Sequence, residues 1–164
     1  MRKLLYLSIF VSATFLFLSS FNQKQTAKSK VVTPHFQTTK MDTITWKFLG
    51  MVKFTKKTDP NYGEVMFPVV SPLLKQKHNK KVAISGFIVP IDSESYALSK
   101  NVFAACFFCG AAGPETIVGL KFKGKTPRLK TDQYVTIVGE LKINENDPDD
   151  WIYNMENTVI VKRL

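Results

Sequence analysis

The chain has 164 residues, of which 45% are hydrophobic and 22% are charged, and its formal net charge is +10 at pH 7. This composition excludes a disordered polar chain, and the length is sufficient for one folded domain but not for two. The positive charge would suit nucleic acid, anionic lipid or a polyanionic glycan, but the lysines are spread along the chain, which favours a role in solubility.

The first 21 residues have the pattern of a secretory signal peptide or of an N-terminal anchor helix that is not cleaved. Arg2 and Lys3 precede an apolar, uncharged run over 4–18, and two serines follow it. We expect 22–42 to form a flexible linker, because this segment is polar and has no periodicity, and 43–164 to fold. The protein is therefore expected to be exported to the periplasm or cell envelope, and to contact a membrane only through its N-terminal segment.

The predicted folded part begins with apolar residues that alternate with lysines over 44–54, which predicts a strand with a bend or bulge at Gly50. The polar run over 56–63 predicts a turn. Ser71 followed by Pro72 predicts the N-cap and the first position of one short helix.

Most of the remaining chain reads as short strands. Two of them, 81–92 and 135–143, share the pattern V-x-I-x-G-x-[IL], and a glycine in the middle of a strand allows the bend that a closed barrel needs. An acidic loop over 144–150 lies within a predicted hairpin. About six to eight short strands without βαβ alternation predict a mainly β fold, a small OB-like barrel that is closed or partly open, with one short helix. The other expected strands are 65–70, 96–105, 116–122, 151–155 and 158–161.

Both cysteines of the chain lie in the segment Cys-Phe-Phe-Cys-Gly-Ala-Ala-Gly-Pro-Glu, residues 106–115. Thiolates at this spacing form half of a typical zinc site, and thiolate ligands also suit copper(I). Cys106 and Cys109 supply only two ligands, so Glu115, His78 or a second copy of the chain in a dimer would have to complete a metal site.

Three other interpretations of the cysteine pair stay open. Two cysteines in an exported domain readily form a structural disulfide. A thiol–disulfide oxidoreductase is a further alternative, although the glycines and proline that follow Cys109 oppose the helix that usually activates such a pair. The pair can also be two buried free thiols that act as small apolar residues.

An ordered set of motifs is similar to that of a known family. The segments Lys-Lys-Val-Ala-Ile-Ser-Gly-Phe-Ile-Val-Pro-Ile (80–91), Cys-Phe-Phe-Cys-Gly-Ala-Ala-Gly-Pro-Glu and Val-x-Ile-x-Gly-x-Leu (135–141) resemble the family catalogued as domain of unknown function 3299. The resemblance implies an exported bacterial protein with an OB-like fold and no settled activity. It aligns Cys106 with the cysteine of the family and Cys109 with the region where many members have a histidine, an exchange that a soft metal tolerates.

The leading hypothesis is a non-enzymatic exported domain that binds zinc or copper(I) through Cys106 and Cys109. Envelope or transporter proteins are the expected partners, and no nucleic acid is expected. The first alternative is a glycan- or peptide-binding module with a Cys106–Cys109 disulfide and a binding face that includes Trp46 and Phe87. The second is a thiol–disulfide oxidoreductase. Enzymatic activity stays open but is not favoured, since the sequence has no catalytic triad pattern, phosphate-binding loop or HExxH motif.

Overall fold

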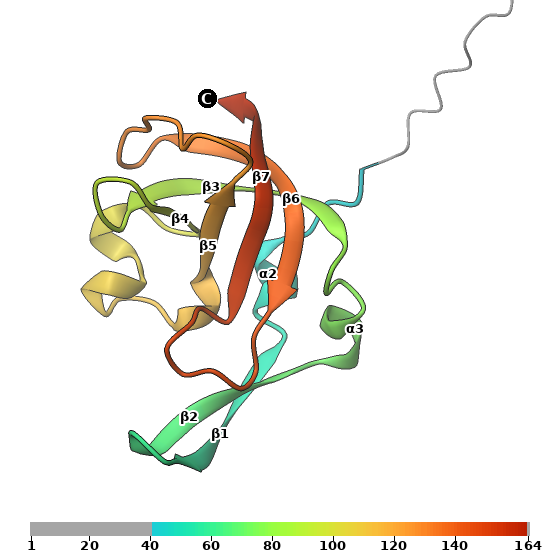
Figure 1. The fold of residues 1–164 in the computed structure, drawn as a ribbon, viewed down its shortest axis with the longest axis vertical. Coiled ribbons are helices and arrows are strands. Elements are labelled where there is room, and N and C mark those ends of the chain that lie inside the picture. The colour runs from blue at the N-terminus through green and yellow to red at the C-terminus, as the bar shows by residue number, and fades with distance from the viewer. Residues whose placement is uncertain (1–40, 164) are drawn as a thin grey trace, which may run out of the picture. The chain divides into compact units, whose positions relative to one another are not determined.

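Alternating apolar and polar residues in the second half of the chain build a closed five-stranded barrel (Figure 1). The structure, a computed structural model, describes residues 41–163. The barrel strands are β3 (Lys81–Pro90), β4 (Tyr96–Ser99), β5 (Ile117–Phe122), β6 (Tyr134–Ile143) and β7 (Tyr153–Arg163). Their order around the barrel is β3-β4-β5-β7-β6, and β3 pairs with β6 to close it. All neighbouring strands are antiparallel except β5 and β7. The mainly β fold and the small OB-like barrel are thus confirmed.

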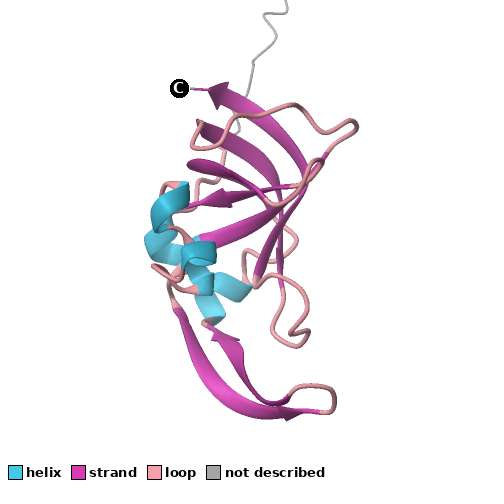
Figure 2. Cartoon of the chain, turned by 90° about the vertical axis from the view of Figure 1, so that its left-hand side faces the viewer, coloured by secondary structure: helices cyan, strands magenta, loops and turns pink. Residues whose placement is uncertain are grey.

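A two-stranded hairpin precedes the barrel and projects away from it (Figures 1 and 2). Short helices flank the hairpin in the sequence, and three 3₁₀ turns lie in the connection between β4 and β5. These elements are α2 (Trp46–Leu49), β1 (Val52–Asp59), β2 (Gly63–Val70), α3 (Pro72–Lys75), η1 (Phe103–Ala105), η2 (Phe107–Cys109) and η3 (Pro114–Thr116).

The predicted strand over 44–54 is wrong in its first half, because the structure has α2 there. The Thr45 side chain caps this helix by accepting a hydrogen bond from the Phe48 amide. In helical form the segment buries Leu49 completely and brings the Trp46 indole to the Ser85 carbonyl, at 2.8 Å. The burial of Leu49 and the hydrogen bond of Trp46 both depend on contacts with the barrel. The alternation of apolar and polar residues over 44–54 therefore wrongly predicted a strand.

Two other local predictions had different outcomes. The predicted turn over 56–63 is shorter, because β1 continues to Asp59 and the Asp59 carboxylate accepts the amides of Asn61 and Tyr62 to reverse the chain. The predicted helix start at Ser71 is confirmed, since the Ser71 side chain accepts the Leu74 amide and Pro72 begins α3.

The barrel core consists of the inward-facing side chains of all five strands. Each such side chain contributes roughly 1.5–3 kcal/mol by leaving water. The mid-strand glycine of β3 has a packing role, because a Cβ on Gly86 would lie 2.5 Å from the Ser99 carbonyl and 2.9 Å from the Trp46 ring. Fully buried core side chains include Val82, Ile84, Ile88, Leu98, Val118, Val135, Ile137, Leu141, Tyr153 and Met155.

The predicted signal or anchor segment over 1–21 and nearly all of the predicted linker over 22–42 lie outside the described residues. Among residues 41–163, no helix is long and apolar enough to cross a membrane. The described chain already joins the barrel at its start, since the Asp42 carbonyl accepts the Ala83 amide and the Ile44 amide donates to the Ala83 carbonyl.

Candidate functional site

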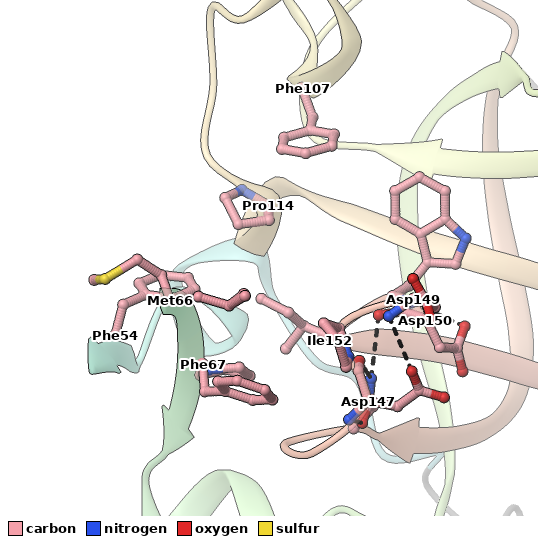
Figure 3. Close-up of a pocket in the computed structure, with 14 residues that line it drawn as sticks. Phe54, Met66, Phe67, Phe107, Pro114, Asp147, Asp149, Asp150 and Ile152 are labelled. Atoms are coloured by element: carbon pink, nitrogen blue, oxygen red, sulfur yellow. Dashed lines mark hydrogen bonds between the residues drawn. The ribbon is translucent and has the colours of Figure 1, made fainter. Parts of the chain in front are cut away.

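An apolar cleft lies between the β1–β2 hairpin, the β4–β5 connection and the β6–β7 loop over 144–152 (Figure 3). Its volume is about 260 Å³. That volume lies just below the range of about 300–1,000 Å³ for sites that enclose a whole small molecule, so the cleft fits one or two side chains of a larger ligand. The apolar side chains that line it include Phe54, Met66, Phe67, Phe107, Pro114 and Ile152.

The two cysteines flank a segment that includes the cleft residue Phe107, but neither cysteine lines the cleft. Cys106 is completely buried, Cys109 is exposed, and both are free thiols. The Cys109 thiol donates to the Phe103 carbonyl at 3.2 Å, and Gly110, with a φ of 70°, ends the 3₁₀ turn between the cysteines. The two sulfur atoms therefore occupy different environments.

The residues predicted to complete a metal site have other partners or positions. The Nδ1 atom of His78 accepts the Ile143 amide at 3.0 Å, which attaches the end of β6 to the segment after α3. Glu115 is half-buried in η3, where its carboxylate folds back over Gly113. Within 41–163, no group of three His, Cys, Asp or Glu side chains is close enough to hold a metal ion.

Phe107 and Trp151 line the cleft, and the Phe108 ring packs against both of them. The rings of Phe107, Phe108 and Trp151 lie edge to face, with centroids 5.6–6.3 Å apart. Trp151 also packs over Gly119 of β5, where a Cβ would lie 2.6 Å from the indole ring. This aromatic cluster attaches the cysteine segment to the β6–β7 loop. An aromatic residue directly after an acidic turn is the only sequence signal for Trp151.

The Asn144 side chain makes four hydrogen bonds within the β6–β7 loop. The Asn144 amide oxygen accepts the backbone amides of Asn146 and Asp147, and its nitrogen donates to the carbonyls of Asp147 and Asp150. These bonds close the loop on itself before any ligand binds.

The hairpin is attached to this loop at both its tip and its base. At the tip, the Tyr62 hydroxyl donates to Asp149 at 2.7 Å, and this bond together with the negative charge of Asp149 raises the pKa of Tyr62. At the base, Glu145 accepts the Val70 amide and pairs with Lys75 at 2.7 Å. Partial burial opposes ionisation of Glu145, but these two partners outweigh it and hold the pKa of Glu145 below its ordinary value.

The rim of the cleft is negatively charged although the chain as a whole is positive. Asp147, Asp149 and Asp150 line the cleft, and none of them takes part in the six ion pairs found within 41–163. Asp150 instead accepts hydrogen bonds from Asn154 and from the Trp151 amide. A ligand with an apolar side chain next to a cation would match this surface.

The structure uses the two predicted binding-face residues in packing. The Trp46 indole is half-buried against Gly86 of β3, and the Phe87 ring lies 5.0 Å from the Tyr134 ring, edge to face. Neither residue lines the cleft.

Comparison with protein-family models, with curated proteins and with solved structures found no match to this chain. The resemblance to domain of unknown function 3299 therefore stays a prediction. The fold and the site define the protein as a small OB-like β-barrel with a preformed apolar cleft.

Proposed function

We propose that this protein is an exported, non-enzymatic binding module whose cleft holds a short stretch of an extended peptide. The observation that carries the proposal is the cleft itself. Its walls come from three separate segments that are joined by the Tyr62–Asp149 hydrogen bond and by the aromatic cluster of Phe107, Phe108 and Trp151. A site that is formed in advance avoids part of the ordering cost of binding.

The lining favours a peptide over a sugar ring. A sugar is usually bound on the open flat face of an aromatic ring, whereas the rings of the cluster lie edge to face at interplanar angles of 64–86°. Grooves lined by aromatic side chains accept extended peptide segments, and Phe54, Phe67, Phe107 and Trp151 line this cleft. The acidic rim favours a peptide with Lys or Arg beside its apolar anchor.

The export part of the proposal is supported by the N-terminal pattern of the sequence, in which basic residues precede an apolar run. An exported protein meets envelope and transporter proteins, and the bound peptide segment would belong to one of these. We also propose that the chain belongs to the family of domain of unknown function 3299 and that it can form dimers.

The hypothesis of zinc or copper(I) at Cys106 and Cys109 stays a prediction. Its support is the spacing of the two thiols. The described residues offer no third ligand beside them, and one thiol is buried while the other is exposed. The peptide-binding function rests on a cleft that the described residues form, and it is therefore the better supported of the two.

Selection of peptides by the purified full-length chain from a displayed library of random decapeptides tests the proposal. Selected peptides should combine an apolar anchor with a basic residue. Met66→Glu places a charge in the wall of the cleft at a half-exposed position and should abolish binding of these peptides. Val161→Glu is the matched control, because Val161 is equally exposed on β7 and does not line the cleft. Failure to select any peptide, or equal binding by the two variants, would contradict the proposal.

A further inference from the structure

Six cationic side chains gather at the end of the barrel away from the cleft. They come from the β5–β6 loop over 123–133 and from the last residues of β7, two segments that are distant in sequence. Barrel closure brings them together, since Arg163 pairs with Val135 at the start of β6 (Figure 1). All six side chains are exposed: Lys123, Lys125, Arg128, Lys130, Lys162 and Arg163. We call this set the basic end.

Carboxylates among residues 41–163 compensate only part of the positive charge of the basic end. None of its cations takes part in the six ion pairs of residues 41–163. Three carboxylates lie in the loops at this end, Asp132 in the β5–β6 loop and Asp92 and Glu94 in the β3–β4 turn, so six cations against three carboxylates leave an excess of three positive charges. Two of these carboxylates are engaged by backbone amides: Asp92 accepts from Glu94 and Ser95, and Asp132 accepts from Phe103.

A hollow of about 330 Å³ lies within the basic end, between the β3–β4 turn and the β5–β6 loop. Its lining includes Lys125, Arg128, Ser93 and Thr126, with Glu94 as the single carboxylate among the lining residues. Cations, hydroxyl groups and a hollow between two loops are suited to an acidic polymer that presents anionic and hydroxyl groups together. Other barrels of this fold hold oligosaccharides and oligonucleotides on loops that include the one between their first two strands, which corresponds here to the β3–β4 turn.

The aromatic rings near the hollow favour a polysaccharide over a nucleic acid. Single-stranded nucleic acids are held by aromatic side chains on which the bases stack. Tyr96 lines the hollow, but its ring lies edge to face with Phe122 at 6.5 Å and 84°, and its hydroxyl accepts the Leu129 amide. The tyrosine is thus occupied within the barrel and does not offer a free stacking face.

We propose that the basic end binds an acidic polysaccharide, with Lys125 and Arg128 in the hollow and the other four cations along the polymer. This surface is separate from the cleft, and its function does not depend on which ligand the cleft takes. A protein with both sites would hold an acidic glycan at one end of its barrel and a peptide at the other.

Fluorescence anisotropy of a labelled heparin dodecasaccharide with the full-length chain in a non-ionic detergent tests this proposal. Binding should weaken steeply between about 50 and 200 mM salt, because each contact between a cation and the polyanion releases a counterion. The variant with Lys125→Gln and Arg128→Gln should bind about tenfold more weakly at the lower salt concentration, and its log–log salt slope should fall by about two. The variant with Lys47→Gln and Lys53→Gln loses the same charge from exposed lysines outside the basic end and should bind like the wild type.

Each contrary result would overturn the proposal. An equal loss of heparin affinity in the two double variants would mean that overall charge, and not the basic end, attracts heparin. If heparin does not bind at about 50 mM salt, the basic end is not a polysaccharide site. Tighter binding of a thymidine dodecanucleotide than of heparin would mean that the ligand of the basic end is a nucleic acid and not a polysaccharide. Met66→Glu, which alters the cleft, should leave heparin binding unchanged. Weaker heparin binding by this variant would mean that heparin binds in the cleft and not at the basic end.

Discussion

The replacement Tyr153→Phe tests how the hairpin is held against the barrel. Tyr153 is completely buried at the start of β7, and its hydroxyl donates to the Leu49 carbonyl at 2.7 Å, across 104 residues of sequence. Leu49 ends α2, and the hairpin that forms one wall of the cleft begins three residues later. This hydrogen bond therefore connects the barrel core to the base of the hairpin.

The expected cost follows from burial. A typical hydrogen bond contributes about 1 kcal/mol to stability, and a buried acceptor that loses its donor costs about 1–3 kcal/mol. We expect Tyr153→Phe to lower the free energy of unfolding by about 2 kcal/mol. Tyr62→Phe is a matched control, since its hydroxyl also donates at 2.7 Å, to Asp149, but in solvent, where the loss should stay below about 0.5 kcal/mol.

Urea denaturation of both variants and of the wild type measures these differences directly. Equal costs for the two tyrosines would refute the reasoning, because burial would then not decide the strength of the bond. A cost below about 0.5 kcal/mol for Tyr153→Phe would mean that water or another donor reaches the Leu49 carbonyl after the hydroxyl is removed.

The same side chain predicts a dependence on pH. Burial, followed by the charges of Glu115 and Glu145, raises the pKa of Tyr153 far above its ordinary value of about 10. The folded state therefore keeps this proton at a pH where the unfolded chain has lost it. The associated stability is fully present below about pH 10 and falls as the pH rises further, by up to about 1.4 kcal/mol per pH unit. Tyr153→Phe should lack this part of the alkaline loss, and parallel alkaline profiles of the two proteins would contradict the assignment.

Two further predictions concern the barrel and the cysteines. Gly86→Ala should destabilise the protein by about 2–3 kcal/mol in urea denaturation, because its Cβ would meet the Ser99 carbonyl. Gly124 lies in open space at a φ of 81°, and Gly124→Ala should cost only about 1 kcal/mol. Equal costs for the two variants would argue against close packing at Gly86. A thiol-reactive dye should label Cys109 in the folded protein and Cys106 only after unfolding. Metal analysis of the same sample completes this test, since a metal site or a disulfide would protect both thiols.

The local part of the fold could be predicted from the sequence. Alternation with a period of two indicated β3 and β6, and the Ser71–Pro72 pair indicated the start of α3, because these signals lie within a few neighbouring residues. The same rule failed at α2, where the burial of Leu49 and the bond from Trp46 to Ser85 outweigh the alternation.

The sequence alone determined the barrel class, the acidic turn after β6 and the presence of a cysteine pair worth testing. Only the tertiary structure decided what these features do, because it placed one thiol inside and the other outside, and it set Trp151 against the phenylalanines between them. The cleft and the basic end likewise consist of loops that no local pattern connects. Closure of the barrel brings such loops together, and closure depends on strand pairing between residues far apart in the chain.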